Sequence, residues 1–232
     1  MSESPERVLH APARLPEYLS DTYTWAYLNP RTMSWLDRAP VVSAILWGNA
    51  GRLMRWAVSR FAPGQTVLQA ACVYGDFSAM LARRLGVEGR LVVTDVAPIQ
   101  ISNARRKLAG LRQAELRVAD LVEPIAEQYD AVCCFFLLHE VPENARRRIV
   151  ANLLGAVKPG GRAVFVDYHR PQRWHPLAPV MALVFRWLEP FAPSLLDTPI
   201  ESLAEEARDF DWHKQTRFGG LYQLIEANRK AC

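Results

Sequence analysis

Two aspartates follow a short loop at a spacing that suits nucleotide binding. The loop lies in residues 67–81 (VLQAACVYGDFSAML), and Gly75 is its single glycine. Nucleotide-binding loops favour glycine because it lacks Cβ and reaches positive φ. Asp95 comes twenty residues after Gly75, where a carboxylate can accept hydrogen bonds from both ribose hydroxyls. Asp120 would then lie beside the adenine and accept from its exocyclic amine.

Both aspartates also have a simpler structural interpretation. Asp95 would cap the helix that opens at Pro98, and Asp120 would stabilise a turn. The nucleotide interpretation extends to the residues beside them. The predicted cofactor-binding residues are Gln69, Ala71, Gly75, Asp95, Val96, Asp120, Leu121 and Phe136.

Acid and imidazole side chains gather at the ends of two later apolar runs. His139 and Glu140 follow one run, and Asp167, Tyr168 and His169 end or follow the next. Such groups suit a hard divalent ion such as manganese, although a loop and helix cap would explain the first pair. Asp76 would be a ligand, a base or a helix N-cap. The predicted metal ligands are Asp76, His139, Asp167 and His169, and the predicted catalytic residues are Gln69, Tyr74, Asp76, His139 and Tyr168.

Apolar runs alternate with helical patterns from residue 66 onward, which predicts βα units. Near-continuous apolar strands indicate a parallel sheet covered on both faces, with ligands at the carboxyl ends of its strands. Adjacent Cys133 and Cys134 would point to opposite faces. The predicted strands are 66–72, 89–95, 115–118, 129–138 and 162–167, the predicted helices are 77–85, 98–109 and 142–157, and 212–217 pairs with 221–228 in a final hairpin.

The predicted fold class is α/β, a doubly wound, mostly parallel seven-stranded sheet of Rossmann-like type with helical cap segments. Residues 1–60 are predicted to form a helical, membrane-proximal N-terminal cap. Residues 61–232 form the nucleotide-binding domain, with an apolar insertion at about 171–210.

Two segments favour an apolar partner. Residues 41–60 are predicted to form one helix that is apolar nearly all round, and residues 177–191 (LAPVMALVFRWLEPF) are apolar apart from two prolines and two charges. The second segment is too short to span a bilayer, which takes about 20 residues, but suits an interfacial helix or a pocket lid. Packing of both segments on the sheet as a cap is the alternative.

Composition excludes several classes of protein. Half of the 232 residues are apolar, and the net charge of +4 is too small to argue for nucleic acid, though it is compatible with an anionic membrane surface. The four cysteines show no disulfide or CxxC pattern, which favours a reducing cytosol. The first ten residues lack the apolar core of a secretory signal.

Several motifs, taken together, resemble the class I S-adenosylmethionine (SAM) methyltransferases. They are Tyr129-Asp130-Ala-Val, the segment 137–142 (LLHEVP) and the segment 158–161 (KPGG). Within that superfamily the chain is similar to the quinone-biosynthesis methyltransferases typified by UbiE, in its aromatic opening at 27–35 and its ending at 218–230. The resemblance covers roughly residues 64–168 and implies a SAM cofactor.

The loop departs from that family. Methyltransferases read roughly V-L-D-x-G-x-G-x-G here, whereas this chain has Gln69 for the acid and Ala71 and Val73 for two glycines. In these departures it resembles the RquA family of rhodoquinone-biosynthesis proteins. That resemblance implies conversion of ubiquinone to rhodoquinone, in which an amino group from SAM replaces a ring methoxy group with the help of a manganese ion. The resemblance also implies a cytoplasmic location, with the protein peripherally associated with the inner leaflet of the inner membrane.

The charge of residue 69 bears on the choice between methyl transfer and amine transfer. A carboxylate favours the protonated form of a nearby amine, and a protonated amine is not a nucleophile. Gln69 is neutral and accepts a hydrogen bond without stabilising that cation. It therefore fits amine donation, but a shifted SAM pose or a decayed site would also explain it. Two other functions stay open, a UbiE-type quinone or phenol C-methyltransferase and a non-catalytic methyltransferase-like scaffold.

Overall fold

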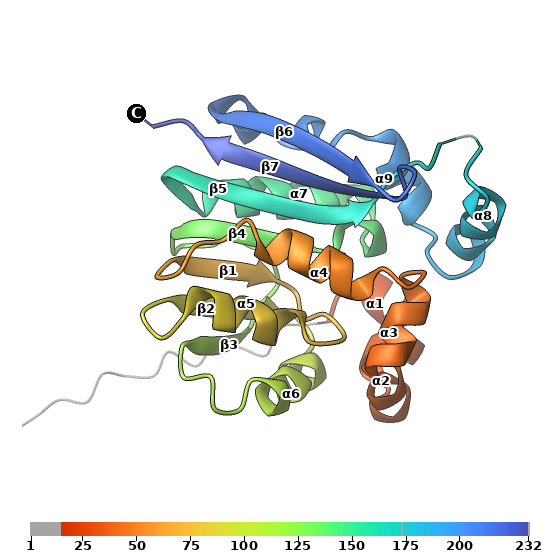
Figure 1. Cartoon of the computed structure of the whole chain (residues 1–232), viewed down its shortest axis with the longest axis horizontal. Helices are drawn as coiled ribbons and strands as arrows, with labels where there is room; N and C mark the ends of the chain where they lie inside the picture. The colour runs from red at the N-terminus through yellow and green to blue at the C-terminus, as the bar shows by residue number, and fades with distance from the viewer. Residues whose placement is uncertain (1–14, 173, 232) are drawn as a thin grey trace, which may run out of the picture.

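A seven-stranded sheet forms the centre of the computed structural model, which describes residues 15–172 and 174–231 (Figure 1). The strand order is β3-β2-β1-β4-β5-β7-β6; β7 runs antiparallel to β5 and β6, and the other pairs are parallel. This confirms the predicted fold class. The strands are β1 (Thr66–Ala70), β2 (Arg90–Asp95), β3 (Ala114–Val118), β4 (Tyr129–Phe135), β5 (Val157–Tyr168), β6 (Phe210–Arg217) and β7 (Tyr222–Arg229).

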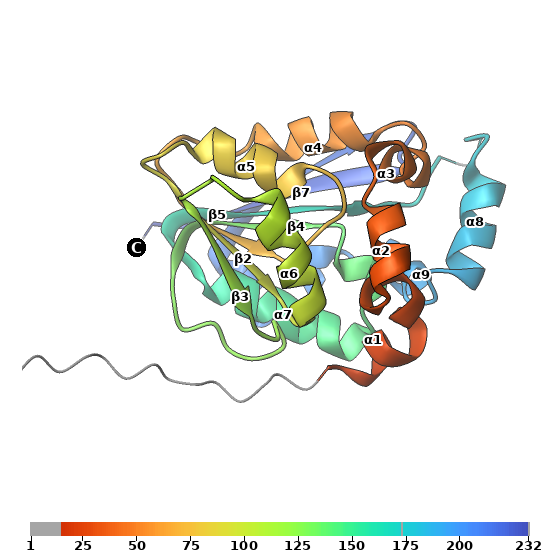
Figure 2. The ribbon, with the colours of Figure 1, turned by 90° about the horizontal axis from the view of Figure 1, so that it is seen from below.

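Helices cover both faces of the sheet, as Figure 2 shows from below. Side chains of α4 (Ala50–Val58) and α5 (Phe77–Leu85) pack on one face, and those of α7 (Glu143–Gly155) pack on the other. Helix α6 (Pro98–Lys107) follows β2. Cys133 lies in the first core and Cys134 in the second, so the two thiols do point to opposite faces as predicted.

Two strands end earlier than predicted because the next residues leave extended geometry. β1 stops at Ala70 since Ala71 has φ 63°, and β4 stops at Phe135 since Phe136 has φ 54°. A short 3-10 helix, η2 (Leu138–Glu140), follows β4. Both changes of direction fall at the carboxyl edge of the sheet, so they shape the surface where ligands bind in this fold.

The single helix predicted over 41–60 is wrong. The chain instead forms α3 (Ala39–Ile45) and α4, separated by a turn in which Trp47 has φ 52° and Gly48 has φ 76°. A helix cannot continue through two residues of left-handed backbone. The indole Nε1 of Trp47 donates to Met181 Sδ at 2.9 Å, which ties this turn to the later apolar segment.

Helices from both ends of the chain cover the carboxyl edge of the sheet. The N-terminal ones are α1 (Glu17–Thr22), the π-helical η1 (Thr24–Leu28), α2 (Pro30–Leu36) and α3. After β5, α8 (Ala178–Trp187) and α9 (Ala192–Asp197) lie at this edge, and η3 (Ile200–Ser202) and η4 (Glu205–Asp209) lead from it to the start of β6. In Figures 1 and 2, α2, α3 and α8 stand beyond the arrowheads of the parallel strands. In the part of the chain that the structure describes, no helix combines the length and apolarity needed to cross a bilayer. Residues 1–10, which are predicted to lack a secretory signal, lie outside the described residues.

A fully buried arginine joins this cover to the core. Arg146 of α7 donates to the carbonyl oxygens of Leu138 (2.8 Å), Val141 (3.0 Å) and Phe191 (2.9 Å). Its guanidinium thus holds the segment after β4 against the start of α9. Burial lowers the pKa of Arg146 from its usual value, while Asp167 and Glu143 act in the opposite sense.

We expect Arg146→Ala to lower the free energy of unfolding by about 3–5 kcal/mol, because it removes a large buried side chain and its hydrogen bonds to the buried carbonyl oxygens of Leu138 and Val141. Arg147→Ala is the matched control, since its exposed side chain bonds only the exposed groups Glu143 and Ser202 O and should matter by less than about 0.5 kcal/mol. Urea denaturation followed by circular dichroism measures both values. Equal losses for the two variants would contradict the role assigned to Arg146.

Candidate functional site

The first of two adjoining pockets lies where β1 and β2 end. Ala71 turns the chain there, and its N–H donates to Thr94 O at 2.8 Å. Asp95 accepts from Cys72 N at 2.8 Å and from Ala97 N at 2.8 Å. These bonds place the Asp95 carboxylate and the backbone of the loop on one pocket wall. The predicted cofactor-binding residues that line this pocket are Ala71, Asp95, Val96, Asp120 and Leu121.

Asp95 is only 7% exposed, and its charge is incompletely compensated. Burial raises the pKa of Asp95 to about 6, although the N–H groups of Ala97 and Cys72 lower it in part. A carboxylate in this state gains from further hydrogen-bond donors. The two hydroxyls of a ribose are donors of that kind.

Asp120 lines the same pocket and also forms the expected turn. Its Oδ1 accepts from Val122 N at 2.9 Å. The ring of Tyr18 from α1 lies close by, and its pKa is raised chiefly by burial and then by Asp120. The nucleoside end of the site is therefore closed by a helix that precedes the sheet in sequence.

The second cavity has a volume of about 430 Å³ and is mostly apolar. It lies between the loop 71–74, the ends of β4 and β5, the helices α2 and α3, and α8. Phe136 lines it, whereas it does not line the nucleoside pocket. Tyr23, Ala71, Cys72 and Glu140 border both cavities, so the two adjoin.

A polar cluster lies at the junction of these cavities. Ligand atoms of His139, Glu140 and Glu189 all lie within 4.8 Å of one another. Behind them, Asp167 is 1% exposed, and its Oδ1 lies 2.8 Å from His139 Nδ1. Asp167 also accepts from Leu138 N at 2.9 Å and from Tyr168 N at 2.7 Å. The imidazole is therefore oriented by a buried carboxylate, which leaves Nε2 toward Glu140 at 3.7 Å.

The carboxylates around His139 favour a cation beside them, which is either the imidazolium itself or a metal ion that displaces its proton. Burial by itself lowers the pKa of His139, but the carboxylate of Asp167 outweighs burial and, with Glu189 and Glu140, raises that pKa to about 9. Burial raises the pKa of Glu189, whose Oε2 accepts from Tyr23 Oη at 2.7 Å. Two carboxylates and an imidazole form a donor set that a hard divalent ion accepts.

Several predicted residues lie outside this cluster. Asp76 is exposed and occupies the N-cap position of α5 without a capping hydrogen bond from its side chain. Nδ1 of His169 lies 2.9 Å from Gly220 O. Asp167 supports His139 from behind. The predicted ligands are thus not gathered at one place, and Glu189 joins His139 instead.

Sequence reasoning missed Glu189 and Tyr23. Glu189 stands in the mostly apolar segment 177–191, and an acid among apolar residues was the signal by which it could have been found. Tyr168 lies beside His139, with ring centroids 4.8 Å apart, so that predicted pair does meet.

Gln69 is fully buried behind the loop and lines neither cavity. Its Nε2 donates to Ala71 O and to Ser78 Oγ, each at 2.9 Å. Its Oε1 has no hydrogen-bond partner among the described residues. The side chain therefore supports the turn at Ala71 and leaves one buried acceptor available.

The rest of the loop is fastened to the N-terminal helices. Tyr74 Oη donates to Ala26 O, and Gly75 N donates to Asp37 Oδ1 at 2.8 Å. Asp37 also pairs with Lys107 Nζ at 2.7 Å. Gly75, with φ 79°, thus serves the attachment of α2 rather than a pocket wall.

Comparison with known proteins identifies the superfamily. Residues 67–161 match the methyltransferase domain family. The chain is 27% identical to an uncharacterized methyltransferase from Synechocystis sp. over 88% of this chain and 94% of that protein. The chain has the fold of the class I SAM methyltransferases, and the methyltransferase domain match falls on its βα core. It is related to quinone methyltransferases, being 29% identical to 2-phytyl-1,4-naphtoquinone methyltransferase from Synechococcus elongatus over 60% of each chain.

The solved structures that resemble this methyltransferase share its fold. An O-methyltransferase family protein from Burkholderia thailandensis superposes with a TM-score of 0.68 at 18% identity, over 92% of this chain and 64% of that one. The chain spans about 60% of the length of the naphthoquinone methyltransferase named above.

The pocket residues of this methyltransferase fit SAM. Asp95 and Asp120 line one pocket at the expected ends of β2 and β3, and the backbone of Ala71 separates that pocket from the apolar cavity. The unpartnered Oε1 of Gln69 is an acceptor beside the same turn. When bound, SAM supplies a methyl group on sulfur and an α-amino group.

We expect SAM affinity to fall as pH drops through about 6. Ribose hydroxyls donate to the ionised form of Asp95, and its pKa of about 6 leaves roughly one tenth of the protein ionised at pH 5. The dissociation constant measured by calorimetry should therefore rise about tenfold between pH 7.5 and pH 5.

Asp95→Asn should bind SAM weakly at pH 7.5 and lose this pH dependence. Asp76→Asn is the control, because Asp76 is exposed and lies outside both cavities. Its pH profile should match that of the unmodified protein. A flat profile for the unmodified protein, with circular dichroism showing it folded throughout, would refute ribose binding by Asp95.

Proposed function

We propose that this enzyme transfers the amino group of SAM to a prenylated quinone of the ubiquinone type, replacing a ring methoxy group as the RquA resemblance implies. A divalent ion, manganese by that resemblance, would supply Lewis-acid chemistry when bound. The observation that carries the proposal is the cluster of His139, Glu140 and Glu189. It lies where a nucleoside pocket meets an apolar cavity.

The apolar cavity suits a quinone ring and the start of its tail. Phe136 and Tyr168 stand edge-on to His139, with centroids 6.0 Å and 4.8 Å away. Aromatic walls favour a flat ring, and the polar cluster faces the side where a ring carbonyl can bind. A long polyprenyl tail exceeds this cavity and partitions into lipid, so a peripheral position at the inner leaflet belongs to the proposal.

The polar cluster suits activation of a quinone carbonyl. Glu140 and Glu189 with His139 would hold the metal, and Asp167 fixes the imidazole from behind as carboxylates do in many metal sites. A Lewis acid on the carbonyl oxygen makes the conjugated ring carbon more electrophilic. In the substitution, a ring carbon–nitrogen bond forms and the ring carbon–oxygen bond to methoxy breaks. The methoxy group takes a proton and leaves as methanol. Release of the aminoquinone then breaks the bond between the nitrogen and the α-carbon of SAM, with loss of a β-proton that leaves the SAM carbon skeleton as an alkene, so the ring keeps its oxidation state.

The neutral residue at position 69 supports the amine as the reacting group. A carboxylate there would stabilise an ammonium, and an ammonium has no lone pair to attack a ring carbon. Gln69 spends its Nε2 on Ala71 and Ser78 behind the loop and lines neither cavity, so position 69 acts on the amine through the negative charge that it lacks.

Methyl transfer to a quinone ring carbon is the second candidate. The relatives favour it, since several of them are quinone methyltransferases, including a demethylmenaquinone methyltransferase from Bacillus licheniformis at 27% identity over 66% of each chain. A scaffold without catalysis is the third reading of the same fold.

The deciding experiment uses SAM labelled with nitrogen-15 at its amino group, with ubiquinone and Mn²⁺. We expect mass spectrometry to find a quinone that has gained the labelled nitrogen and lost one methoxy group. A methylated quinone without label would overturn amination in favour of methyl transfer. Bound SAM with no quinone product would favour the scaffold.

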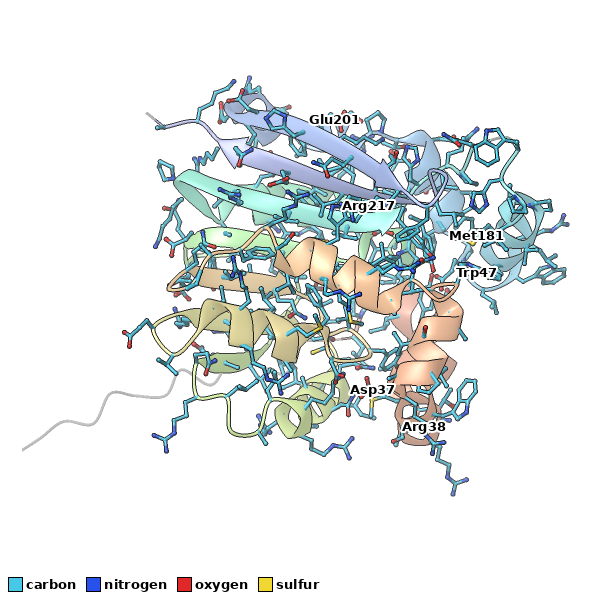
Figure 3. The ribbon with its side chains drawn as sticks, viewed as in Figure 1. Asp37, Arg38, Trp47, Met181, Glu201 and Arg217 are labelled. Atoms are coloured by element: carbon cyan, nitrogen blue, oxygen red, sulfur yellow. The ribbon has the colours of Figure 1, made fainter. Side chains whose placement is uncertain are left out.

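The metal ligands are tested by binding alone. We expect Glu189→Gln to weaken Mn²⁺ binding at least about tenfold, because it removes one anionic ligand. The control is Glu201→Gln. Glu201 is an exposed glutamate on η3, and Figure 3 shows it far from Trp47 and Met181, which line the apolar cavity. Electron paramagnetic resonance of free Mn²⁺ gives both dissociation constants. Equal constants for the two variants would exclude Glu189 as a ligand.

A further inference from the structure

Helix α8 is apolar on its outer as well as its inner side. Met181 and Phe185 are buried against the rest of the protein. On the outer side, Val180, Leu183 and Trp187 are 42%, 59% and 72% exposed, at the i, i+3, i+7 spacing of one helical stripe. A helix at a purely aqueous surface carries polar residues there, so this stripe requires a partner.

The stripe continues into the rim of the apolar cavity. Trp35 of α2, Ile45 of α3 and Leu188 after α8 are all about half exposed, and all three also line the cavity. Figures 1 and 2 place α2, α3 and α8 at the same end of the molecule, and the Trp47–Met181 contact joins the two sides (Figure 3). We name this surface the rim patch; it consists of Trp35, Ile45, Val180, Leu183, Trp187 and Leu188.

The exposed charges beside the rim patch have one sign. Arg31 lies in the first turn of α2, Arg38 follows that helix, and Arg186 lies on α8 next to Trp187. The two acids of the same segments are engaged elsewhere, since Asp37 pairs with Lys107 and Glu189 accepts from Tyr23. An apolar surface fringed by cations and tryptophans matches an anionic bilayer, whose interface favours all of these groups.

We infer that the rim patch docks on an anionic phospholipid bilayer and that the cavity mouth opens into the lipid, so that the quinone enters without crossing water. This inference rests on the proposed function for the identity of the substrate, while docking itself does not. The cavity volume of about 430 Å³ holds a ring with a short piece of tail, and the bilayer accommodates the remainder. A second copy of the chain fits less well, because a two-fold contact through this patch would bring its arginines against one another.

The test is co-sedimentation with vesicles of phosphatidylcholine, with and without phosphatidylglycerol. We expect binding to the anionic vesicles that weakens with salt, and a loss of at least about tenfold for the double variant Leu183→Asp with Trp187→Asp. Val87→Asp is the control, because Val87 is 86% exposed, follows α5 and lies outside both cavities. It should bind vesicles as the unmodified protein does.

Unchanged vesicle binding by the double variant, with SAM affinity retained, would overturn the inference. So would dimers in light scattering that the double variant abolishes while no form of the protein binds vesicles. Neither measurement uses catalysis, so failure of quinone amination leaves the docking result interpretable. If both hold, the double variant should lose turnover of vesicle-embedded ubiquinone but keep turnover of a short-tailed, water-soluble analogue.

Discussion

The buried carboxylate of Asp167 is the interaction on which the rest of the site depends. It stands near the end of β5, accepts N–H bonds from Leu138 and Tyr168, and pairs with the imidazole of His139. An ionised carboxylate with 1% exposure is stable only when such partners surround it, because desolvation of an unpaired charge costs several kcal/mol. Asp167 therefore fixes the separation of the β4 and β5 ends and the orientation of the one histidine in the cluster. The geometry at the junction of the two cavities therefore depends on Asp167.

The cap completes what Asp167 begins. Glu189 comes from the segment between α8 and α9, and Tyr23 from the N-terminal helices, yet the two meet through a 2.7 Å hydrogen bond beside His139. Arg146 stabilises the same region, because it donates hydrogen bonds to the carbonyl oxygens of both Leu138 and Phe191. Three parts of the chain that are distant in sequence thus converge on one cluster of acid and imidazole groups. Because that cluster includes a cap residue, a bound ion would also fix the cap over the apolar cavity, which couples the proposed metal to the proposed substrate site.

Periodicity sufficed to predict the order of elements, the parallel sheet and the final hairpin, since buried parallel strands need near-continuous apolar runs. It also placed Asp95 and Asp120 in one pocket, because acids that follow neighbouring strands must share an edge. Strand ends at Ala70 and Phe135 were not predictable, as the positive φ of the next residues is imposed by tertiary contacts. The glycine at position 48 was a signal for the break between α3 and α4, but the apolar pattern of residues 41–60 outweighed it. Glu189 was missed because no local rule links an acid in the cap to a histidine after β4.

The altered loop is best understood as a matched pair of residues. Ala71 adopts φ 63° where the family pattern has glycine, and left-handed backbone costs an L-residue roughly 1–2 kcal/mol. Two hydrogen bonds offset this cost, from Ala71 N to Thr94 O and from Gln69 Nε2 to Ala71 O. An ionised acid at position 69 has no N–H and would repel the Ala71 carbonyl, so the amide is what this turn requires. The exchange of acid for amide therefore supports the fold of the loop and, at the same time, removes a negative charge from beside the pocket. A single substitution with both effects explains how the loop keeps a SAM-type pocket while losing most of its glycines.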